Sequence, residues 1–291
     1  MLLKKLTAAP KSAMPRGLEL QDIIYNSAPE MRSLAFKSGY ALGTEVYRSA
    51  NNGGIATLEH VLVHAGFGKV IYHPFELMST FTSYAPRSGG QNLGLNVHVF
   101  ETGLIAGYLS AHTGQRIGVQ ETACVFNGAN HCMFVAKVGS TVNAEAYKRL
   151  GLQEVILALR HALLHAERRK ANESYYILSI KPLLNEPVLS EATKFLYVVG
   201  KMLVSQFPSE PAKTIEQSSS LLNISSSRLK SNRKKGVSLS LSYDHETSSG
   251  SFVDLSTALI SGLMKGAYGK NVRIKRGISS KGVYNVKLEV L

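Results

Sequence analysis

The chain has 291 residues, of which 44% are hydrophobic, and a formal net charge of +13. This is the composition of a globular protein with one large domain or two of ordinary size. No apolar run approaches the roughly 18 residues that a membrane-spanning helix needs. Residues 1–15 include Lys4 and Lys5 but lack the apolar core of a signal peptide. We therefore expect a cytoplasmic protein without a membrane span.

The first part of the chain alternates helical and strand patterns. In chain order it predicts helices over 31–48 and 55–65, strand character over 69–84, a helix over 99–113 and a pair of strands over 116–138. Gly114 directly follows the third helix, where glycine commonly adopts the left-handed conformation that ends a helix.

Both cysteines of the chain, Cys124 and Cys132, lie in the last strand pair. Between them, Asn127-Gly128 predicts a type I′ hairpin turn, which needs positive φ at both central residues. The reversal places Cys124 roughly opposite Cys132. Glu121 lies three residues before Cys124, and an ideal strand would point the two to opposite faces. A site that uses both therefore requires a bulge or bend between them.

Glu, Cys and His are zinc ligands, and a structural zinc site needs about four of them. Glu121, Cys124 and Cys132 supply three. The fourth could be His131, which neighbours Cys132 and is expected to face away, or His98, just before the helix over 99–113. Two alternatives stay open: buried, inert cysteines, or a disulfide, which a reducing compartment disfavours.

Residues 144–170 predict one long connecting helix, after which the pattern of the first part returns. The second part predicts helices over 189–206 and 214–222, a strand over 237–243, a helix over 252–267 before Gly269, and strands over 271–290.

Two sequence stretches repeat in the same order and at nearly the same offset. Residues 100–119 resemble residues 255–274 at an offset of 155, and residues 37–43 resemble residues 194–200 at an offset of 157. We take this as an internal duplication. The predicted organisation is a first unit at 17–139, a helical connector at 140–173 and a second unit at 174–291.

The positive charge is concentrated in residues 174–291, which contain 16 Lys and Arg against 8 Asp and Glu. Two clusters account for much of it: Arg228, Lys230, Arg233, Lys234, Lys235, and Lys270, Arg273, Lys275, Arg276. We expect the first cluster to form an exposed loop. In the second, alternation should point Arg273 and Lys275 to solvent while Val272 and Ile274 face the core. Such clusters can bind nucleic acid or an acidic partner, but without interleaved aromatic residues we favour a solvated surface.

The run from Phe100 to Val135 resembles the 4-vinyl reductase domain. The features that carry the resemblance are Gly107, Gly114, Glu121-x-x-Cys124, Gly128 and Cys132-x-Phe134. The resemblance implies the fold of the small TRAPP vesicle-tethering subunits, an α+β unit in which an antiparallel sheet and packed helices enclose an apolar pocket. The expected fold class is thus α/β, with two tandem units of this kind.

The resemblance also implies a structural zinc ion. Related phenol-responsive sensor domains bind zinc through a Glu, a Cys three residues later, a Cys eight residues after that, and a residue 23 before the Glu. In this chain these positions are Glu121, Cys124, Cys132 and His98. The family commonly has Cys at the His98 position. The second unit has lost the set: Arg276 replaces Glu121, Ser279 replaces Cys124, Val253 replaces His98, and Tyr284 or Val286 replaces Cys132.

Three functions follow as hypotheses. The resemblance favours a sensor that binds an apolar or aromatic small molecule and signals through a protein partner or homodimer. The alternative is a TRAPP-like adaptor. An enzyme is less expected, because we find no Ser-His-Asp set, paired catalytic carboxylates or dinucleotide fingerprint.

Overall fold

A computed structural model of the chain defines the fold. It describes residues 2–7, 13–15, 24–26, 29–51, 53–67, 69–74, 78–83, 94, 96–140, 151–164, 168–170, 186–207, 210–221, 226–232, 236–243, 250–278 and 284–291. The chain divides into two compact units. The first comprises Met1–Glu154 and Glu167–Pro182, and the second comprises Val155–Ala166 and Leu183–Leu291. Every helix within the described ranges is too short or too polar to cross a lipid bilayer.

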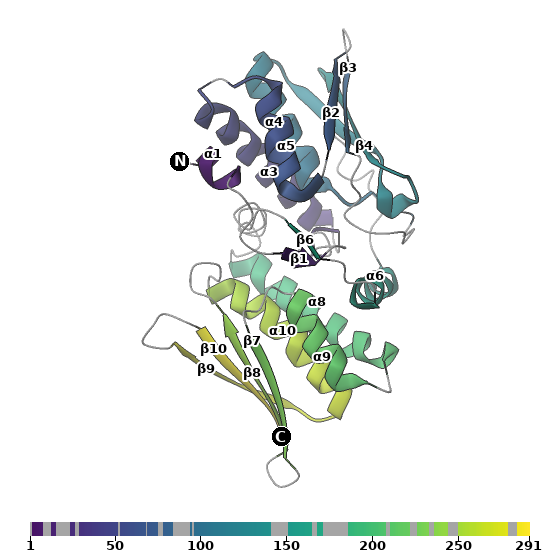
Figure 1. Cartoon of the computed structure of the whole chain (residues 1–291), viewed down its shortest axis with the longest axis vertical. Coiled ribbons are helices and arrows are strands. Elements are labelled where there is room, and N and C mark those ends of the chain that lie inside the picture. The colour runs from purple at the N-terminus through teal and green to yellow at the C-terminus, as the bar shows by residue number, and fades with distance from the viewer. Residues whose placement is uncertain are drawn as a thin grey trace. The chain divides into compact units, whose positions relative to one another are not determined.

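The first unit is a four-stranded antiparallel sheet with helices on one side (Figure 1). The sheet order is β2-β3-β5-β4. The elements are α1 (Leu2–Leu6), β1 (Ala13–Pro15), α3 (Pro29–Ser49), α4 (Ile55–Leu62), a π-helical turn (Val63–Phe67), β2 (Val70–Pro74), β3 (Met78–Ser83), α5 (Val99–Thr113), β4 (Ile117–Ala123), a 3-10 turn (Val125–Asn127), β5 (Cys132–Val138) and β6 (Arg168–Lys170), which pairs with β1.

Helix α5 forms the centre of this unit. Its residues from Val99 to Leu109 are all buried, as expected for a helix that is apolar around most of its circumference. It packs against α3 so closely that a Cβ atom on Gly43 or on Gly107 would overlap a backbone carbonyl oxygen of the other helix. Gly114 ends α5 in the left-handed conformation, with φ of 69°.

The second unit has the same succession of elements. These are α6 (Leu152–Leu164, of which the part from Val155 belongs to this unit), α8 (Glu186–Leu203), a 3-10 turn (Val204–Gln206), α9 (Pro211–Leu221), β7 (Ser226–Asn232), β8 (Gly236–Tyr243), α10 (Gly250–Tyr268), β9 (Val272–Ile278) and β10 (Tyr284–Val290). The sheet order is β7-β8-β10-β9. In both units, therefore, two antiparallel hairpins are joined through one helix, and the last strand lies inside the sheet. Figure 1 shows α8, α9 and α10 beside this sheet.

The predicted α/β class, with two antiparallel sheets packed with helices, is confirmed. The helix predicted over 99–113 agrees with α5 at both ends. The single long helix predicted over 144–170 is wrong in its C-terminal part, because α6 ends at Leu164 and Arg168–Lys170 form strand β6. Pairing with β1 gives these three residues backbone partners that an isolated helix end would lack.

Two expectations for the basic clusters are also wrong. Arg228 and Lys230 lie on strand β7 rather than in a loop, because β7 pairs with β8 and places Leu229 opposite the buried Leu239. Residues 233–235 of that cluster lie outside the described residues. Ile274 is 42% exposed instead of facing the core. It sits on the edge strand β9, where the helices leave part of the sheet face uncovered.

Candidate metal centre

Four buried side chains meet where α5 begins and the β4–β5 hairpin turns. His98 immediately precedes α5, Glu121 lies on β4, Cys124 follows β4, and Cys132 is the first residue of β5. The β4–β5 register shifts between Glu121 and Ala123. This bulge is the distortion expected from the three-residue spacing, and it lets Glu121 and Cys124 serve the same site.

The turn between the cysteines differs from the predicted one. Residues Val125–Asn127 form a 3-10 turn, and only Gly128 has positive φ, at 83°. A type I′ turn would also need positive φ at Asn127. The longer connection brings the chain back to β5 with backbone N–H groups of Asn127 and Ala129 both donating to the Cys124 carbonyl oxygen, at 2.9 and 3.1 Å.

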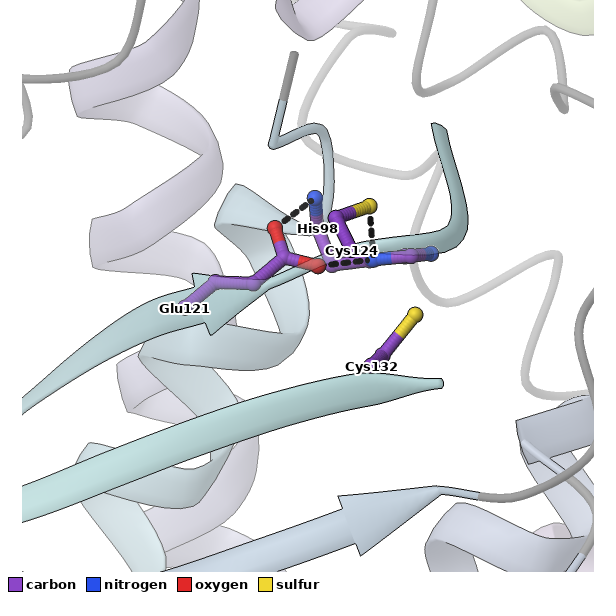
Figure 2. Close-up of side chains that lie close together, drawn as sticks. All are labelled: His98, Glu121, Cys124 and Cys132. Carbon is purple, nitrogen blue, oxygen red and sulfur yellow. Dashed lines mark hydrogen bonds and ion pairs between the residues drawn. The ribbon is translucent and has the colours of Figure 1, made fainter. Parts of the chain in front are cut away.

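The donor atoms of the four side chains lie within 4.8 Å of one another. His98 Nδ1 is 2.6 Å from Glu121 Oε1 and 3.6 Å from Cys124 Sγ. The backbone N–H of His98 donates to the other carboxylate oxygen, Oε2, at 3.1 Å. Figure 2 shows the side chains converging, with the Cys132 sulfur pointing from its strand toward the other three residues. All four are buried, with 3% exposure or less.

Phenyl rings enclose the His98 imidazole. Its ring centroid is 5.1 Å from that of Phe67, 6.0 Å from that of Phe126 and 6.2 Å from that of Phe134. The Ser83 hydroxyl donates to the Phe67 carbonyl oxygen, which ties the end of the π-helical turn to β3. This surrounding keeps water away and lowers the local dielectric, so charges in the site interact strongly.

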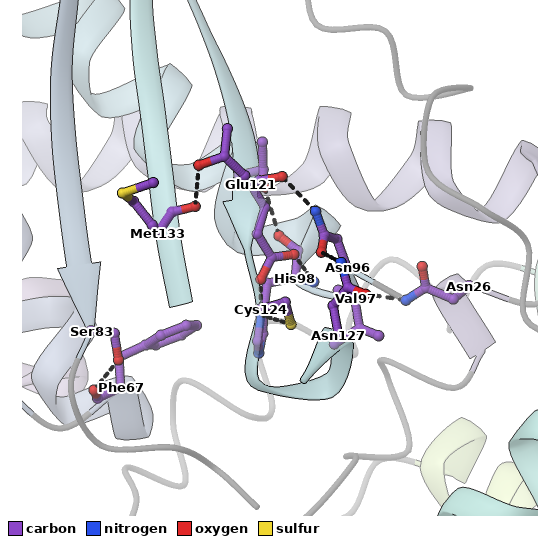
Figure 3. Close-up of polar contacts among 12 residues, drawn as sticks. Asn26, Phe67, Ser83, Asn96, Val97, His98, Glu121, Cys124, Asn127 and Met133 are labelled. Atoms are coloured by element: carbon purple, nitrogen blue, oxygen red, sulfur yellow. Dashed lines mark hydrogen bonds and ion pairs between the residues drawn. The ribbon is translucent and has the colours of Figure 1, made fainter. Parts of the chain in front are cut away.

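Asparagine side chains hold the segment before α5 in place (Figure 3). Asn96 Nδ2 donates to the Glu121 carbonyl oxygen at 2.6 Å, and Asn127 Nδ2 donates to Asn96 Oδ1 at 3.3 Å. Asn26 Nδ2 donates to the Val97 carbonyl oxygen at 3.0 Å. These bonds fix the backbone on both sides of the site. The sequence analysis missed Asn96 and Phe67, because neither lies in the cysteine motif and only the folded chain brings them there.

The ionisation of the cluster reflects burial and close charges. Burial by itself lowers the pKa of His98, but the neighbouring Glu121 carboxylate and Cys132 thiolate outweigh it and raise that pKa well above its usual value. Hydrogen bonding from Cys124 lowers the pKa of Cys132 to about 4 against the effect of burial, with help from His98. Burial, hydrogen bonding to Cys132 and the Glu121 charge raise the pKa of the Cys124 thiol. In the metal-free site, one thiol thus keeps its proton and the other loses it.

The donor set fits a zinc ion. One imidazole nitrogen, one carboxylate and two cysteine sulfurs provide four ligands of the kinds that zinc prefers, and no position is left for water. His98 Nδ1 faces the other donors, whereas Nε2 has no hydrogen-bond partner among the described residues. A zinc-bound histidine usually donates its second N–H to a polar group, so this site differs in having an aromatic surrounding instead.

The structure also bears on the alternatives for this site. Of the two histidines considered, His98 lies in the cluster, and His131 does not contribute a donor to it. Both cysteines are free thiols rather than a disulfide.

The second unit has an ion pair at the corresponding place. Arg276, which the repeat aligns with Glu121, pairs with Asp254 in the first turn of α10. Val253, aligned with His98, is 2% exposed. A strand residue and a residue at the start of the following helix therefore interact in both units, but in the second unit the strand residue is the cation.

The cationic residues of β9 lie on both faces of the strand. On the face opposite Arg276, Lys275 Nζ is 2.9 Å from a Glu289 carboxylate oxygen, and Lys287 Nζ is 2.7 Å from the other oxygen. Hydrogen bonds from Lys287 and Lys275 lower the pKa of Glu289 to about 2. Arg273 and Lys270 are exposed.

Comparisons with known proteins point to one family. The 4-vinyl reductase domain model matches residues 85–138, which contain all four cluster residues. Similar solved structures include the phenol-responsive sensory domain of the transcription activator PoxR with phenol, with 21% identity and a TM-score of 0.32 over 40% of this chain and 69% of that one. A vinyl-4-reductase family protein from Methanocaldococcus jannaschii has 19% identity and a TM-score of 0.30 over 36% and 68%. No curated protein sequence matches the chain significantly. The domain match confirms the resemblance to the 4-vinyl reductase domain inferred from residues 100–135.

Proposed function

We propose that the chain is a sensor protein that binds an apolar or aromatic small molecule and contains one structural zinc ion. The observation that carries the proposal is the buried cluster of His98, Glu121, Cys124 and Cys132 within the residues that match the 4-vinyl reductase domain. A buried set of two thiols, an imidazole and a carboxylate is costly to keep without a cation, because each charged group has lost its hydration.

The role of zinc in this proposal is structural. All four coordination positions would be filled by protein donors, so the ion would stabilise charge and shape rather than activate water. It would tie together three segments that are distant in sequence: the start of α5, the end of β4 and the start of β5. Rigidity at this junction supports a sensor domain, because α5 is the central helix of the unit.

The small-molecule part of the proposal rests on the domain match, since domains of the 4-vinyl reductase type include sensors of aromatic compounds. The resemblance implies an apolar pocket between sheet and helices, and such a pocket suits a ligand with few polar groups. The sequence contains no ATPase or helix-turn-helix motif, so the proposed signal would pass to a partner chain.

Two measurements on the full chain test this function. Native mass spectrometry with elemental analysis should find one zinc per chain. Differential scanning fluorimetry with phenol, 4-ethylphenol and dodecanoate should reveal saturable stabilisation, which amounts to about 2.7 kcal/mol at a ligand concentration 100 times Kd. Stoichiometric zinc without binding of any of these probes would leave a metalloprotein and contradict the sensor.

The second candidate is an adaptor built of two tandem vinyl-reductase-like units, at residues 17–139 and 174–291, joined by a helical connector at 140–173. The common strand order supports it. So do the close helix contacts at aligned glycines: Gly43 and Gly107 in the first unit correspond to Gly200 and Gly262 in the second, and each meets the backbone of the opposing helix. An adaptor would bind a protein partner but none of the small-molecule probes.

A further inference from the structure

Strand β9 has a free edge. It pairs with β10 on one side, and among the residues that the structure describes no strand pairs with its other side. An edge strand presents backbone N–H and C=O groups on which another strand can add. Extended segments of partner proteins bind in this way, with backbone pairing for affinity and side-chain pockets for specificity.

A groove runs beside this edge. It has a volume of about 690 Å³ and lies between α8, α10 and β9. Its walls include Tyr197, Val198 and Ile274, which are 37%, 43% and 42% exposed. These three are among the few large hydrophobic side chains exposed in the described part of the chain. Their grouping in one groove marks a docking surface rather than scattered surface residues.

The exposure of Ile274 is unusual for its position. Its cross-strand neighbour Leu288 on β10 is fully buried, so Ile274 stands on the core face of the sheet. In the first unit, the residue that the repeat aligns with Ile274 is Val119 on β4, and it is 1% exposed. The second unit thus leaves open a core-type position that the first unit closes.

The opposite face of β9 carries an excess of positive charge. Arg273 and Lys275 point to that face, and β10 adds Lys287 and Glu289, so one carboxylate stands against three cations. The cations beside the groove are compensated differently: Arg276 pairs with Asp254, and Lys194 pairs with Glu191 at 2.8 Å. Positive charge is therefore in surplus on the face away from the groove.

The charge pattern selects the kind of partner. Pairing of β9 with β9 of a second copy would bring Arg273 and Lys275 close to like charges, which is destabilising. Nucleic acid would find no aromatic side chain on the basic face of β9 for base stacking, and the groove on the other face is largely apolar. An acidic, extended segment of another protein satisfies both faces.

We propose that β9 is the docking edge for an extended segment of a partner protein in which apolar and acidic residues alternate. Strand side chains alternate between faces. One set would enter the groove against Ile274 and Tyr197, and the other set would meet Arg273 and Lys275. This proposal goes beyond the sensor and adaptor functions, and it is independent of the zinc site because β9 belongs to the other unit.

Selection from a library of displayed random heptapeptides, with the full chain as bait, tests the proposal. The enriched sequences should alternate apolar residues with Asp or Glu. A consensus peptide should bind, by fluorescence anisotropy, at least tenfold more tightly than a peptide of the same composition with its acidic residues in one block. It should also slow hydrogen exchange of the β9 amides. Enrichment of basic or non-alternating peptides, no enrichment, or competition by duplex DNA more effective than by the peptide itself would overturn it.

Variants locate the site. Arg273→Glu with Lys275→Glu should weaken binding of the consensus peptide at least tenfold, and Ile274→Asp should do so without changing the outer charges. Lys137→Glu, at an exposed strand position of the first unit, is the matched control and should bind normally. Circular dichroism must show each variant folded. Equal loss with Lys137→Glu would reduce the effect to net charge and contradict docking at β9.

Discussion

At the scale of single residues, the charge balance of the cluster depends on all four donors together. Glu121 accepts from the His98 backbone and contacts its ring, while Cys124 and Cys132 share a proton unequally. Removing one donor leaves the others buried with unpaired charge. Losing one partner of a buried ionic group typically costs about 3–5 kcal/mol.

We predict that Cys124→Ser abolishes stoichiometric zinc binding and lowers the melting temperature by roughly 10 °C, given that 1 kcal/mol corresponds to about 2–4 °C in a chain of this size. Elemental analysis and differential scanning calorimetry measure the two effects. His131→Asn, adjacent to Cys132 but outside the cluster, is the control and should retain zinc. Full zinc occupancy in Cys124→Ser would contradict the ligand assignment.

Zinc binding should depend steeply on pH. Binding needs a neutral His98 and two thiolates. In the metal-free site the pKa values of His98 and Cys124 are both raised, so each holds a proton near pH 7, whereas Cys132, with a pKa of about 4, does not. Two protons must then leave, and lowering the pH by one unit should weaken zinc binding about 100-fold.

Competition with a chromophoric chelator at pH 7.5 and 6.5, corrected for protonation of the chelator itself, measures this dependence. The sign follows from mass action, since acid favours the protonated, metal-free site. Affinity that does not change between these two pH values would mean that the ligands are already deprotonated in the metal-free protein.

At the scale of elements, each unit depends on two helices in close contact. In the second unit, a Cβ atom on Gly262 would overlap the Tyr197 carbonyl oxygen on α8. The helices would have to separate, and overpacking of this kind commonly costs about 1–3 kcal/mol.

We therefore predict that Gly262→Ala lowers the free energy of unfolding by about 2 kcal/mol in urea denaturation. The matched substitution is Gly54→Ala, where φ is −74° and no atom lies within 4 Å of the added Cβ. That change should stay within about 0.5 kcal/mol. Equal effects of the two substitutions would show that α8 and α10 do not require the glycine contact.

At the scale of the whole molecule, each compact unit has its own sheet and its own buried helix pair. The proposed zinc ion would belong to the first unit only. Its binding energy should therefore stabilise one part of the chain more than the other, because local opening is governed by local contacts.

We predict that chelation of zinc accelerates hydrogen exchange in α5, β4 and β5 by at least tenfold and changes exchange in α10, β9 and β10 by less than twofold. Exchange read by mass spectrometry on the full chain, with and without chelator, measures both. Uniform acceleration across the two sets would show that the chain opens as one cooperative block, contrary to the predicted division into two units.

The sequence by itself determined most elements and three of the four candidate ligands. Helix α5, its terminal Gly114 and the need for a bulge after Glu121 follow from periodicity, glycine conformation and residue spacing, which are local properties. The Asn127-Gly128 turn was predicted wrongly, because the approach of Cys124 to His98 favours a longer connection than an isolated hairpin would adopt.

Only the tertiary structure decided the choice of His98 over His131, since the two differ in which side chain the start of α5 brings to the hairpin. It also decided the strand order, the pairing of β7 and the exposure of Ile274. Alternation places Ile274 on the core face of the sheet, but whether a core-facing residue is covered depends on how far the helices extend over the sheet. That depends on contacts between segments distant in the chain, which no local pattern encodes.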